Sequence, residues 1–301
     1  QYVHDRTVES LGLLYAMHWP YRQVETARGV RRSAIHDKLV ALGACMGEVN
    51  GWERPNWYAP RGVEAKYEYS YGRQNWWPYA DAEAKALQSK VVMFDQSSFS
   101  KYLVQGKDAA KVLNRISAND VDAEEGRIVY TQWCNERGGI EADLTVTRLA
   151  ADKFMVVTGC APQTRDFAWL TAHTPDDAQC IATDVTSGLP MFALMGPNSR
   201  PLLQKLSGMD LSTAAFPFGT SKEMEIGYAR VRASRITYVG ELGWELYIPT
   251  EFAAHVFERI LEAGAEFGLT LAGMHTMNNA RVEKAYRHWG HDISDEDTPV
   301  E

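Results

Sequence analysis

The stretch that decides the fold runs from residue 128 to residue 147 and reads IVYTQWCNERGGIEADLTVT. Its two ends are rich in β-branched and aromatic residues, and residues 135–139, NERGG, supply the asparagine and glycines of a tight turn. In the second half every other residue from Ile140 to Val146 is apolar, which is the period of a strand with one buried face. The stretch therefore predicts a β-hairpin with strands over 128–134 and 140–149.

Asp143 lies in the middle of the second predicted strand and has apolar neighbours on both sides in sequence. A carboxylate in that place would be partly desolvated, and it could orient a bound amine or accept a proton from it. The period alone favours a simpler interpretation, in which Asp143 belongs to a solvated outer face, because charged residues are mostly exposed. Both interpretations stay open on the pattern alone.

Further strands and helices alternate around this hairpin. The patterns predict strands over 100–104, 154–157, 191–195, 223–234 and 243–248, and helices over 81–92, 109–116, 162–173, 198–206 and 251–267. Asp81 and Thr250 are the expected N-caps of the first and the last of these helices. Strands outnumber helices and come mostly as hairpins, so we expect an α+β fold with antiparallel sheets rather than a doubly wound parallel sheet.

Residues 238–245, YVGELGWE, form a second candidate site. The two glycines allow a tight reversal, and the ring of Tyr238 and the carboxylate of Glu245 flank it. A ring that can stack and an acceptor-only carboxylate suit a heterocycle with adjacent N–H donors. An ordinary hairpin with an exposed glutamate is the alternative interpretation.

A helix over 278–289 is the third candidate. Its apolar stripe would consist of Val282, Ala285, Tyr286 and Trp289. Arg281 begins a basic stripe on another face, which continues through residues 284, 288 and 291 if the helix extends past Gly290. Such a stripe could hold the polyanionic tail of a ligand, although the solvated face of an amphipathic helix is the commoner explanation.

Charge, the lengths of apolar runs and cysteine spacing argue against nucleic-acid-binding, membrane-spanning and zinc-binding proteins. The 301 residues leave room for about two domains of about 150 residues each. The net charge of −8 gives no general attraction to nucleic acid or anionic lipid, and no apolar run approaches the ~18 residues of a membrane helix. We therefore expect neither partner. The four cysteines lack zinc-ligand spacing, so we expect no metal site and a reducing compartment.

Residues 1–80 differ in texture from the rest of the chain. They contain Trp19, Trp52, Trp57, Trp76 and Trp77 and, apart from a short helical pattern at 39–42, show no clean period. An irregular connecting region packed by aromatic side chains is expected there, with 51–57 as a turn-rich segment. The sequence has neither GxGxxG nor GxxxxGK[ST], the loops that cradle cofactor phosphates. It begins at Gln1 and ends after an acidic run, so we expect a fragment of a longer polypeptide.

Taken in order, these segments resemble the tetrahydrofolate-binding aminomethyltransferase of glycine cleavage, the T-protein family. The matching segments are 119–121 (NDV), Tyr130 with 135–140 (NERGGI), 143–144 (DL), 195–198 (MGPN) and 238–245. The upstream segments 31–33 (RRS), 51–57 (GWERPNW) and 71–76 (YGRQNW) resemble the junction in dimethylglycine and sarcosine dehydrogenases, where a flavin domain runs into the folate domain. The resemblance implies a T-protein-like fold over 81–301 without its C-terminal barrel, preceded over 1–80 by the end of a flavin-oxidoreductase domain and its connector.

The resemblance also implies a division of labour. The FAD-dependent domain would oxidise an N-methyl amine to an iminium. The folate domain would capture the one-carbon unit on tetrahydrofolate as 5,10-methylenetetrahydrofolate. FAD would be bound mostly outside this chain, so the chain alone is not expected to oxidise a substrate. Electrons would pass to oxygen or to an electron-transfer flavoprotein, in a bacterial cytoplasm or a mitochondrial matrix.

Site residues follow from the same match. Asp143 matches the family's catalytic aspartate, which orients the cofactor and assists proton transfer. The residues implied to bind folate are Tyr130, Thr158, Tyr238, Glu245 and Arg281. Thr158 stands where the T-protein has a strand asparagine, Ala142 where it has the first of two aspartates, and Met277 where it has an additional arginine. These departures bear on folate affinity and on the handling of the glutamate tail.

Two alternatives belong to other functional classes. One is a non-catalytic folate-fold protein, like the relatives that serve iron–sulfur cluster assembly. Their Lys-Gly-Cys-Tyr signature is absent from the sequence, and Asp143 is retained. The other is a folate-dependent demethylase that works without a flavin, against which the flavin-type junction upstream argues.

Overall fold

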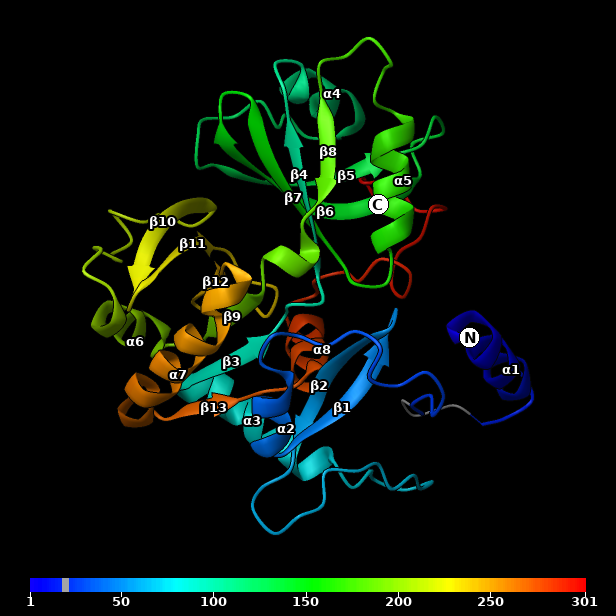
Figure 1. Cartoon of the computed structure of the whole chain (residues 1–301), viewed down its shortest axis with the longest axis vertical. Helices are drawn as coiled ribbons and strands as arrows, with labels where there is room; N and C mark the ends of the chain where they lie inside the picture. Colours follow the sequence, from blue (N-terminus) through cyan, green and yellow to red (C-terminus); the bar gives the residue numbers. More distant parts are fainter. Residues whose placement is uncertain (18–21) are drawn as a thin grey trace.

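Three β-sheets organise the chain in a computed structural model that describes residues 1–17 and 22–301 (Figure 1). Trp19, one of the aromatic residues expected to pack the N-terminal region, lies outside the described residues. A five-stranded sheet forms the upper part of the molecule in Figure 1, and a six-stranded sheet lies below and to its left. A two-stranded hairpin lies beside α8 near the six-stranded sheet.

The predicted hairpin is the start of the five-stranded sheet. In spatial order this sheet consists of β5 (Ile128–Cys134), β6 (Ile140–Ala150), β7 (Lys153–Thr158), β4 (Ser100–Gln105) and β8 (Ile181–Asp184). All its neighbouring strands run antiparallel. The apolar residues of β6 are buried together with Trp133 and Tyr102, as their two-residue period predicts. The α+β prediction with antiparallel sheets is confirmed here.

The six-stranded sheet is mostly antiparallel as well. Its strands in spatial order are β10 (Thr220–Ile226), β11 (Ala229–Arg235), β12 (Gly243–Tyr247), β9 (Met191–Met195), β3 (Val91–Asp95) and β13 (Leu269–Leu271). Only the pairing of β13 with β3 is parallel. The predicted helix over 81–92 is confirmed as far as Ser89, but its last two residues, Val91 and Val92, begin β3. The continuous apolar run that begins at Val91 is fully buried between β9 and β13, which suits a central strand.

Helices cover the faces and edges of these sheets. They are α1 (Tyr2–Leu13), α2 (His36–Ala41), α3 (Trp77–Ser89), α4 (Ala109–Ile116), α5 (Gln163–Ala172), α6 (Ser199–Leu206), α7 (Ala253–Gly264) and α8 (Met274–Glu283), with 3₁₀ turns at η1 (Thr186–Gly188), η2 (Thr250–Phe252) and η3 (Ala265–Phe267). Two predicted caps are wrong. Helix α3 begins four residues before Asp81, with Pro78 in its first turn, and the Thr250 hydroxyl donates to Ser187 O instead of capping α7.

The N-terminal region is less irregular than its sequence texture predicts. Strands β1 (Ala44–Val49) and β2 (Trp52–Tyr58) pair antiparallel as a hairpin, so the expected turn-rich segment 51–57 is mostly a strand. A register shift between Cys45 and Met46 accommodates Pro55, which pairs with Met46. Both faces of β2 are largely buried, which removes the alternation that would have marked a strand in the sequence.

The third candidate helix ends earlier than predicted. α8 stops at Glu283, and Ala285 takes a positive φ of 58°, so the chain leaves the helix before Gly290. Val282 and Tyr286, which were expected in a buried stripe, are exposed. The predicted basic stripe through residues 284, 288 and 291 is therefore not a helix face. No helix among the described residues has the length and apolar character needed to cross a bilayer.

Candidate functional site

Asp143 lies on β6 directly opposite Gln132 of β5. The Gln132 side-chain amide donates a 3.0 Å hydrogen bond from Nε2 to Asp143 Oδ1, and the Tyr130 hydroxyl also bonds to this carboxylate. Burial raises the pKa of Asp143, while these two hydrogen bonds oppose the rise by stabilising the anion. The arrangement gives a partly desolvated carboxylate with two neutral donors, which is how a proton acceptor is positioned. Asp143 lies on the less buried face of β6, as the alternation predicts, but it is partly buried there and not fully solvated.

Tyr238 lies close to Asp143 and to Tyr130, although it comes from the segment between β11 and β12. Burial raises the pKa of Tyr238 to about 12, and the Asp143 carboxylate contributes to the rise. Burial raises the pKa of Tyr130 too, with Asp143 as the next cause and Tyr238 a smaller one. The Tyr238 hydroxyl donates a 3.0 Å bond to Arg287 O. Two phenol rings thus flank the carboxylate, and Tyr130 is half exposed.

Arg281 belongs to the same neighbourhood, because its charge opposes the rise in the pKa of Tyr238. Its guanidinium is held within the chain: Nε and Nη2 donate to Asn278 Oδ1 at 2.9 and 2.8 Å, and Nη1 donates to Tyr286 O at 3.1 Å. Nη1 also forms an ion pair with Asp292. Most of the donors that could contact a ligand are therefore already engaged.

Glu245 is placed on β12 between β11 and β9, on the other sheet. The Tyr247 hydroxyl donates a 2.7 Å bond to Glu245 Oε2, and no described residue donates to Oε1. Burial raises the pKa of Glu245, while the Tyr247 bond and the charge of Lys101 lower it. One oxygen of a partly buried carboxylate is thus free to accept from a ligand. An exposed hairpin glutamate, the alternative for this residue, is wrong.

Lys101, which supports Glu245, is itself fully buried on β4. Its ammonium donates a 2.9 Å bond to Ser97 O, and burial lowers its pKa to about 7. The charges of Asp95, Asp184 and Glu245 oppose that fall. The lysine therefore brings positive charge from the five-stranded sheet to a glutamate on the six-stranded sheet, across the junction of the two.

Thr158 ends β7 and donates a 2.6 Å bond from Oγ1 to Asp166 Oδ2 on α5. Burial raises the pKa of Asp166 to about 6, and Asp143 is among the smaller causes of the rise. Asp166 Oδ1 is buried without a hydrogen-bond partner. Asp166 is thus a second protonatable carboxylate near Asp143. Thr158 links β7 to it through its hydroxyl.

The structure brings Tyr130, Asp143, Tyr238 and Arg281 into one cluster, with Thr158 joined to it through Asp166. Glu245 lies with Lys101 and Tyr247 in a second cluster, and the described interactions do not link it directly to Asp143. Sequence reasoning missed Gln132, Lys101, Tyr247 and Asp166. Gln132 carried a usable signal, because a hairpin with five turn residues places it nearly opposite Asp143.

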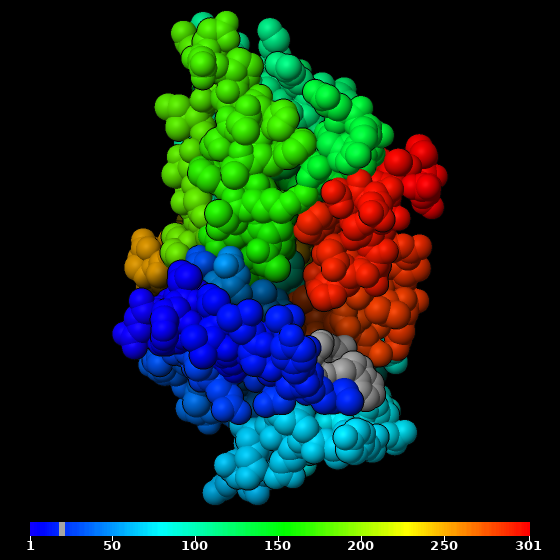
Figure 2. Space-filling view, turned by 90° about the vertical axis from the view of Figure 1, so that its right-hand side faces the viewer, coloured from blue at the N-terminus to red at the C-terminus, as the bar shows by residue number. Residues whose placement is uncertain are grey.

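The C-terminal segment crosses the start of β6 next to this site. Trp289 donates from Nε1 to Ile140 O at 2.7 Å, and Ile140 N donates to Asp297 O at 3.0 Å. Gly139 is required here, because a Cβ would lie 2.0 Å from Asp295 O. Figure 2 shows these red C-terminal residues packed against the green and cyan-green part of the molecule, with the blue N-terminal segment below.

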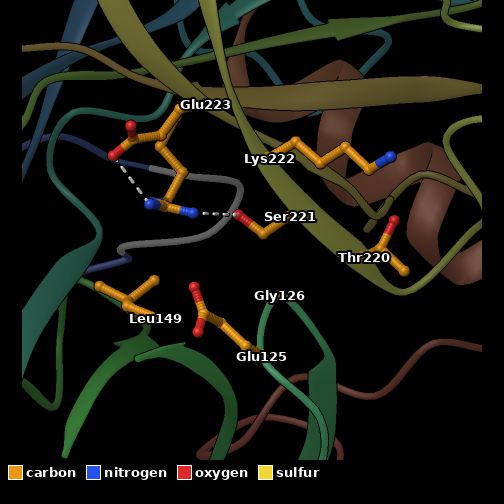
Figure 3. Close-up of a pocket in the computed structure, with 8 residues that line it drawn as sticks. Glu125, Gly126, Leu149, Thr220, Ser221, Lys222 and Glu223 are labelled. Carbon is orange, nitrogen blue, oxygen red and sulfur yellow. Dashed lines mark hydrogen bonds and ion pairs between the residues drawn. The ribbon is translucent and has the colours of Figure 1, made fainter. Parts of the chain in front are cut away.

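A cavity of about 460 Å³ lies away from these residues, between the turn before β5 and the start of β10 (Figure 3). Its lining residues are Glu125, Gly126, Leu149, Thr220, Ser221, Lys222, Glu223 and Arg232. Arg232 donates to Glu223 at 3.0 Å and to Ser221 at 3.5 Å, so its charge is neutralised within the wall. None of the predicted site residues lines this cavity.

The residues present suit a reduced pterin. Its ring carries adjacent N–H donors, which the open Oε1 of Glu245 can accept, and its face can lie on the rings of Tyr130 and Tyr238. Asp143 supplies a second acceptor beside those rings. Over residues 1–17 and 22–301, no group of three or more His, Cys, Asp or Glu side chains could hold a metal ion.

Comparisons with known families agree with the fold and the order of the segments. The family described as the GCVT N-terminal domain matches residues 35–301, and the FAD dependent oxidoreductase central domain matches residues 1–33. The structure resembles that of the glycine cleavage system aminomethyltransferase T from Bartonella henselae, with a TM-score of 0.76, 23% identity and coverage of 90% of this chain and 67% of that one. At that identity the likeness establishes the fold alone.

Two curated relatives match almost the whole chain. A protein of Paenarthrobacter nicotinovorans, 4-methylaminobutanoate oxidase (formaldehyde-forming), is 44% identical over 99% of this chain and 36% of its own length. The human mitochondrial sarcosine dehydrogenase is 33% identical over 100% of this chain and 37% of its own length. The chain thus spans little more than a third of the length of these relatives.

Proposed function

The chain belongs to the GCVT N-terminal domain family, and on that premise we propose that it is the folate-binding part of an N-methyl-amine oxidoreductase. It captures the one-carbon unit of an oxidised N-methyl group on tetrahydrofolate, giving 5,10-methylenetetrahydrofolate. The observation that carries the proposal is the partly buried carboxylate of Asp143, which accepts hydrogen bonds from Gln132 and Tyr130 beside the ring of Tyr238.

Binding and orientation are divided between the two clusters. Glu245 accepts from the ring N–H groups of the pterin, while the Tyr247 bond and the charge of Lys101 oppose the rise that burial causes in its pKa. Tyr130 and Tyr238 stack on the pterin and exclude water from one side of Asp143. Thr158 and Arg281 act less directly in this proposal, because Asp166 and Asp292 already engage them.

Tetrahydrofolate supplies two nucleophilic amines, N5 and N10, that together replace the amine nitrogen on the one-carbon unit. The overall exchange releases the demethylated amine and one proton. Asp143 is the acceptor for that proton, because it is desolvated yet held as an anion by two neutral donors. Its charge also stabilises a cationic iminium placed next to it.

FAD belongs to the proposed whole enzyme rather than to the residues described. The match of residues 1–33 to an FAD dependent oxidoreductase central domain supports this. The names of both curated relatives, an oxidase and a dehydrogenase, support an oxidoreductase. We propose a small carboxylate-bearing N-methyl amine as substrate and oxygen or an electron-transfer flavoprotein as acceptor, in bacterial cytoplasm or mitochondrial matrix. The division of the chain at residue 80 stays a prediction.

A second candidate function is release of the one-carbon unit as formaldehyde, and the name of one relative supports it. The Paenarthrobacter protein is described as formaldehyde-forming. Water, instead of folate, would then take the iminium carbon, releasing formaldehyde and the amine. The folate domain would in that case bind its ligand without capturing the carbon quantitatively.

Product analysis separates the two. The oxidoreductase containing this chain is supplied with an N-methyl amino acid, with and without tetrahydrofolate, and methylenetetrahydrofolate and formaldehyde are measured together. The proposal predicts that tetrahydrofolate converts formaldehyde release into methylenetetrahydrofolate formation, and that Asp143→Asn restores formaldehyde release. Equal formaldehyde yields with and without tetrahydrofolate would favour the second candidate.

A further inference from the structure

Arg54 is a partly buried arginine whose charge no described residue neutralises. It lies on β2, opposite Gly47 of β1, and its Nε is buried without a hydrogen-bond partner. No hydrogen bond or ion pair involves the rest of its guanidinium within residues 1–17 and 22–301. Its one carboxylate neighbour of note, Glu48, already accepts from Arg6 and from Gly51 N.

Other arginines in the interior donate hydrogen bonds to a carboxylate or to neutral acceptors. Arg28 donates to Glu53 at 2.6 and 2.7 Å, Arg281 is held by Asn278 and Asp292, and Arg235 donates to Phe216 O at 2.6 Å. An unpaired buried charge costs several kcal/mol in general, because its lost hydration is not replaced. Arg54 therefore departs from the pattern of the same protein, in a direction that costs stability.

Three elements surround the guanidinium of Arg54. Its charge affects Tyr67 in the segment after β2, Cys160 in the loop between β7 and α5, and His275 on α8. Tyr67 bonds to His275 Nε2 at 2.7 Å and accepts from Asn56 at 2.8 Å, so these neutral groups satisfy one another. β2 packs directly on α8, as Figure 1 shows.

The neighbouring histidine adds no competing positive charge. Burial and, to a smaller extent, the charge of Arg54 lower the pKa of His275 to about 4, so this imidazole is neutral at pH 7. The loop that carries Cys160 also bonds to the hairpin, because Asn50 donates to Cys160 O at 3.2 Å. Arg54 thus places an unpaired positive charge where the β1–β2 hairpin meets α8 and the loop after β7.

We propose that Arg54 binds the carboxylate group of a ligand, and that this carboxylate replaces the ion-pair partner that the chain does not supply. A guanidinium matches a carboxylate through two parallel N–H···O bonds, and one arginine balances one such group. The inference rests on the proposed function, which supplies two ligands of this chemistry. One is the N-methyl amino acid or its iminium, and the other is the glutamate tail of the folate.

Paired ligands that differ only in the carboxylate test this directly. Calorimetry measures binding of folinic acid against 5-formyltetrahydropteroate, which lacks the glutamate, and of 4-methylaminobutanoate against its amide. Arg54→Gln should weaken binding of one carboxylate-bearing member by about 10- to 100-fold, as loss of a charge-assisted contact predicts. Its carboxylate-free partner should bind as before. The pair that responds identifies the source of the carboxylate.

Two control variants show whether a loss of affinity is specific to the Arg54 guanidinium. Arg61→Gln removes an exposed arginine from the same region and should change no affinity. Arg54→Lys should give an intermediate loss, because it keeps the charge without the fork. If Arg54→Gln does not fold, the pKa of His275 is measured by NMR in the unmodified chain, with and without each ligand. A bound carboxylate should raise its pKa, and the amide should not.

Unchanged affinity of a folded Arg54→Gln for both carboxylate-bearing ligands overturns the inference, and so does a His275 pKa indifferent to them. Failure of the unmodified chain to bind folinic acid is a different result. It counts against the proposed function, while the 4-methylaminobutanoate pair still tests Arg54.

Discussion

The two carboxylates of the proposed site stand in opposite settings on two different sheets. Asp143, on the five-stranded sheet, accepts hydrogen bonds only from the neutral groups of Gln132 and Tyr130. Glu245, on the six-stranded sheet, is supported by Tyr247 and by the buried ammonium of Lys101. A cation favours the ionised form of a carboxylate, whereas neutral donors stabilise it less. On the proposed function, this difference favours proton transfer at Asp143 and ligand binding at Glu245.

The largest effect is expected at Asp143. Asp143→Asn should reduce methylenetetrahydrofolate formation by about 10²- to 10⁴-fold, since a positioned acid–base group contributes about that much. Folate affinity should change little, because the asparagine can keep the hydrogen bond from Gln132. Rates and dissociation constants measured on the oxidoreductase containing the chain check both halves. Asp152→Asn, at an exposed turn of the same sheet, is the matched control.

Glu245→Gln should reduce folate affinity more than turnover, the opposite of Asp143→Asn. Loss of a charged acceptor in a buried place is expected to weaken folate binding by about 10- to 100-fold, while turnover at saturating folate falls far less than in Asp143→Asn. Glu225→Gln replaces an exposed glutamate on β10, the edge strand of the same sheet, and should leave binding unchanged. A Glu245→Gln variant that loses turnover and keeps its affinity would contradict the comparison.

Lys101→Met tests the contribution of the lysine to the setting of Glu245. Without the ammonium the pKa of Glu245 should rise, because Lys101 now lowers it, so folate binding should weaken at neutral pH and recover as the pH increases. Burial lowers the pKa of Lys101 to about 7 from 10.5, so the unfolded state binds more protons between about pH 7 and 10. Unfolding free energy of the native chain should therefore rise with pH in that window, and Lys101→Met should flatten the rise in chemical denaturation.

The parts of the fold and the site that the sequence predicts are those whose interacting residues lie close together in the sequence. The hairpin at 128–147 follows from a strict two-residue period, and Asp143 follows from its place in that period. β2 was missed because both its faces are buried and Pro55 interrupts it, and the end of α8 was missed because nothing in the sequence marks the positive φ of Ala285. Lys101 and Asp166 act on Glu245 and Asp143 from other strands and helices, so only tertiary structure reveals them.

The smallest effect is expected at Asp166, which supports the Asp143 side. Burial raises its pKa to about 6 from 3.8, so the folded state binds more protons than the unfolded state between about pH 4 and 6. Unfolding free energy should fall as the pH rises through that window. Asp166→Asn should remove the fall and gain at most about 3 kcal/mol at pH 7, reduced by any weakening of the bond with Thr158. Denaturation curves at pH 4.5 and pH 7 measure it.

The central claim is that this chain binds a reduced folate with Glu245 as the anchor and Asp143 as the proton acceptor. Calorimetric titration of the chain with folinic acid, beside Glu245→Gln and Asp143→Asn, tests it most directly. The account predicts saturable binding at one site, weakened about 10- to 100-fold by Glu245→Gln and little by Asp143→Asn. No binding by the unmodified chain, or equal affinity in the Glu245→Gln variant, would contradict it.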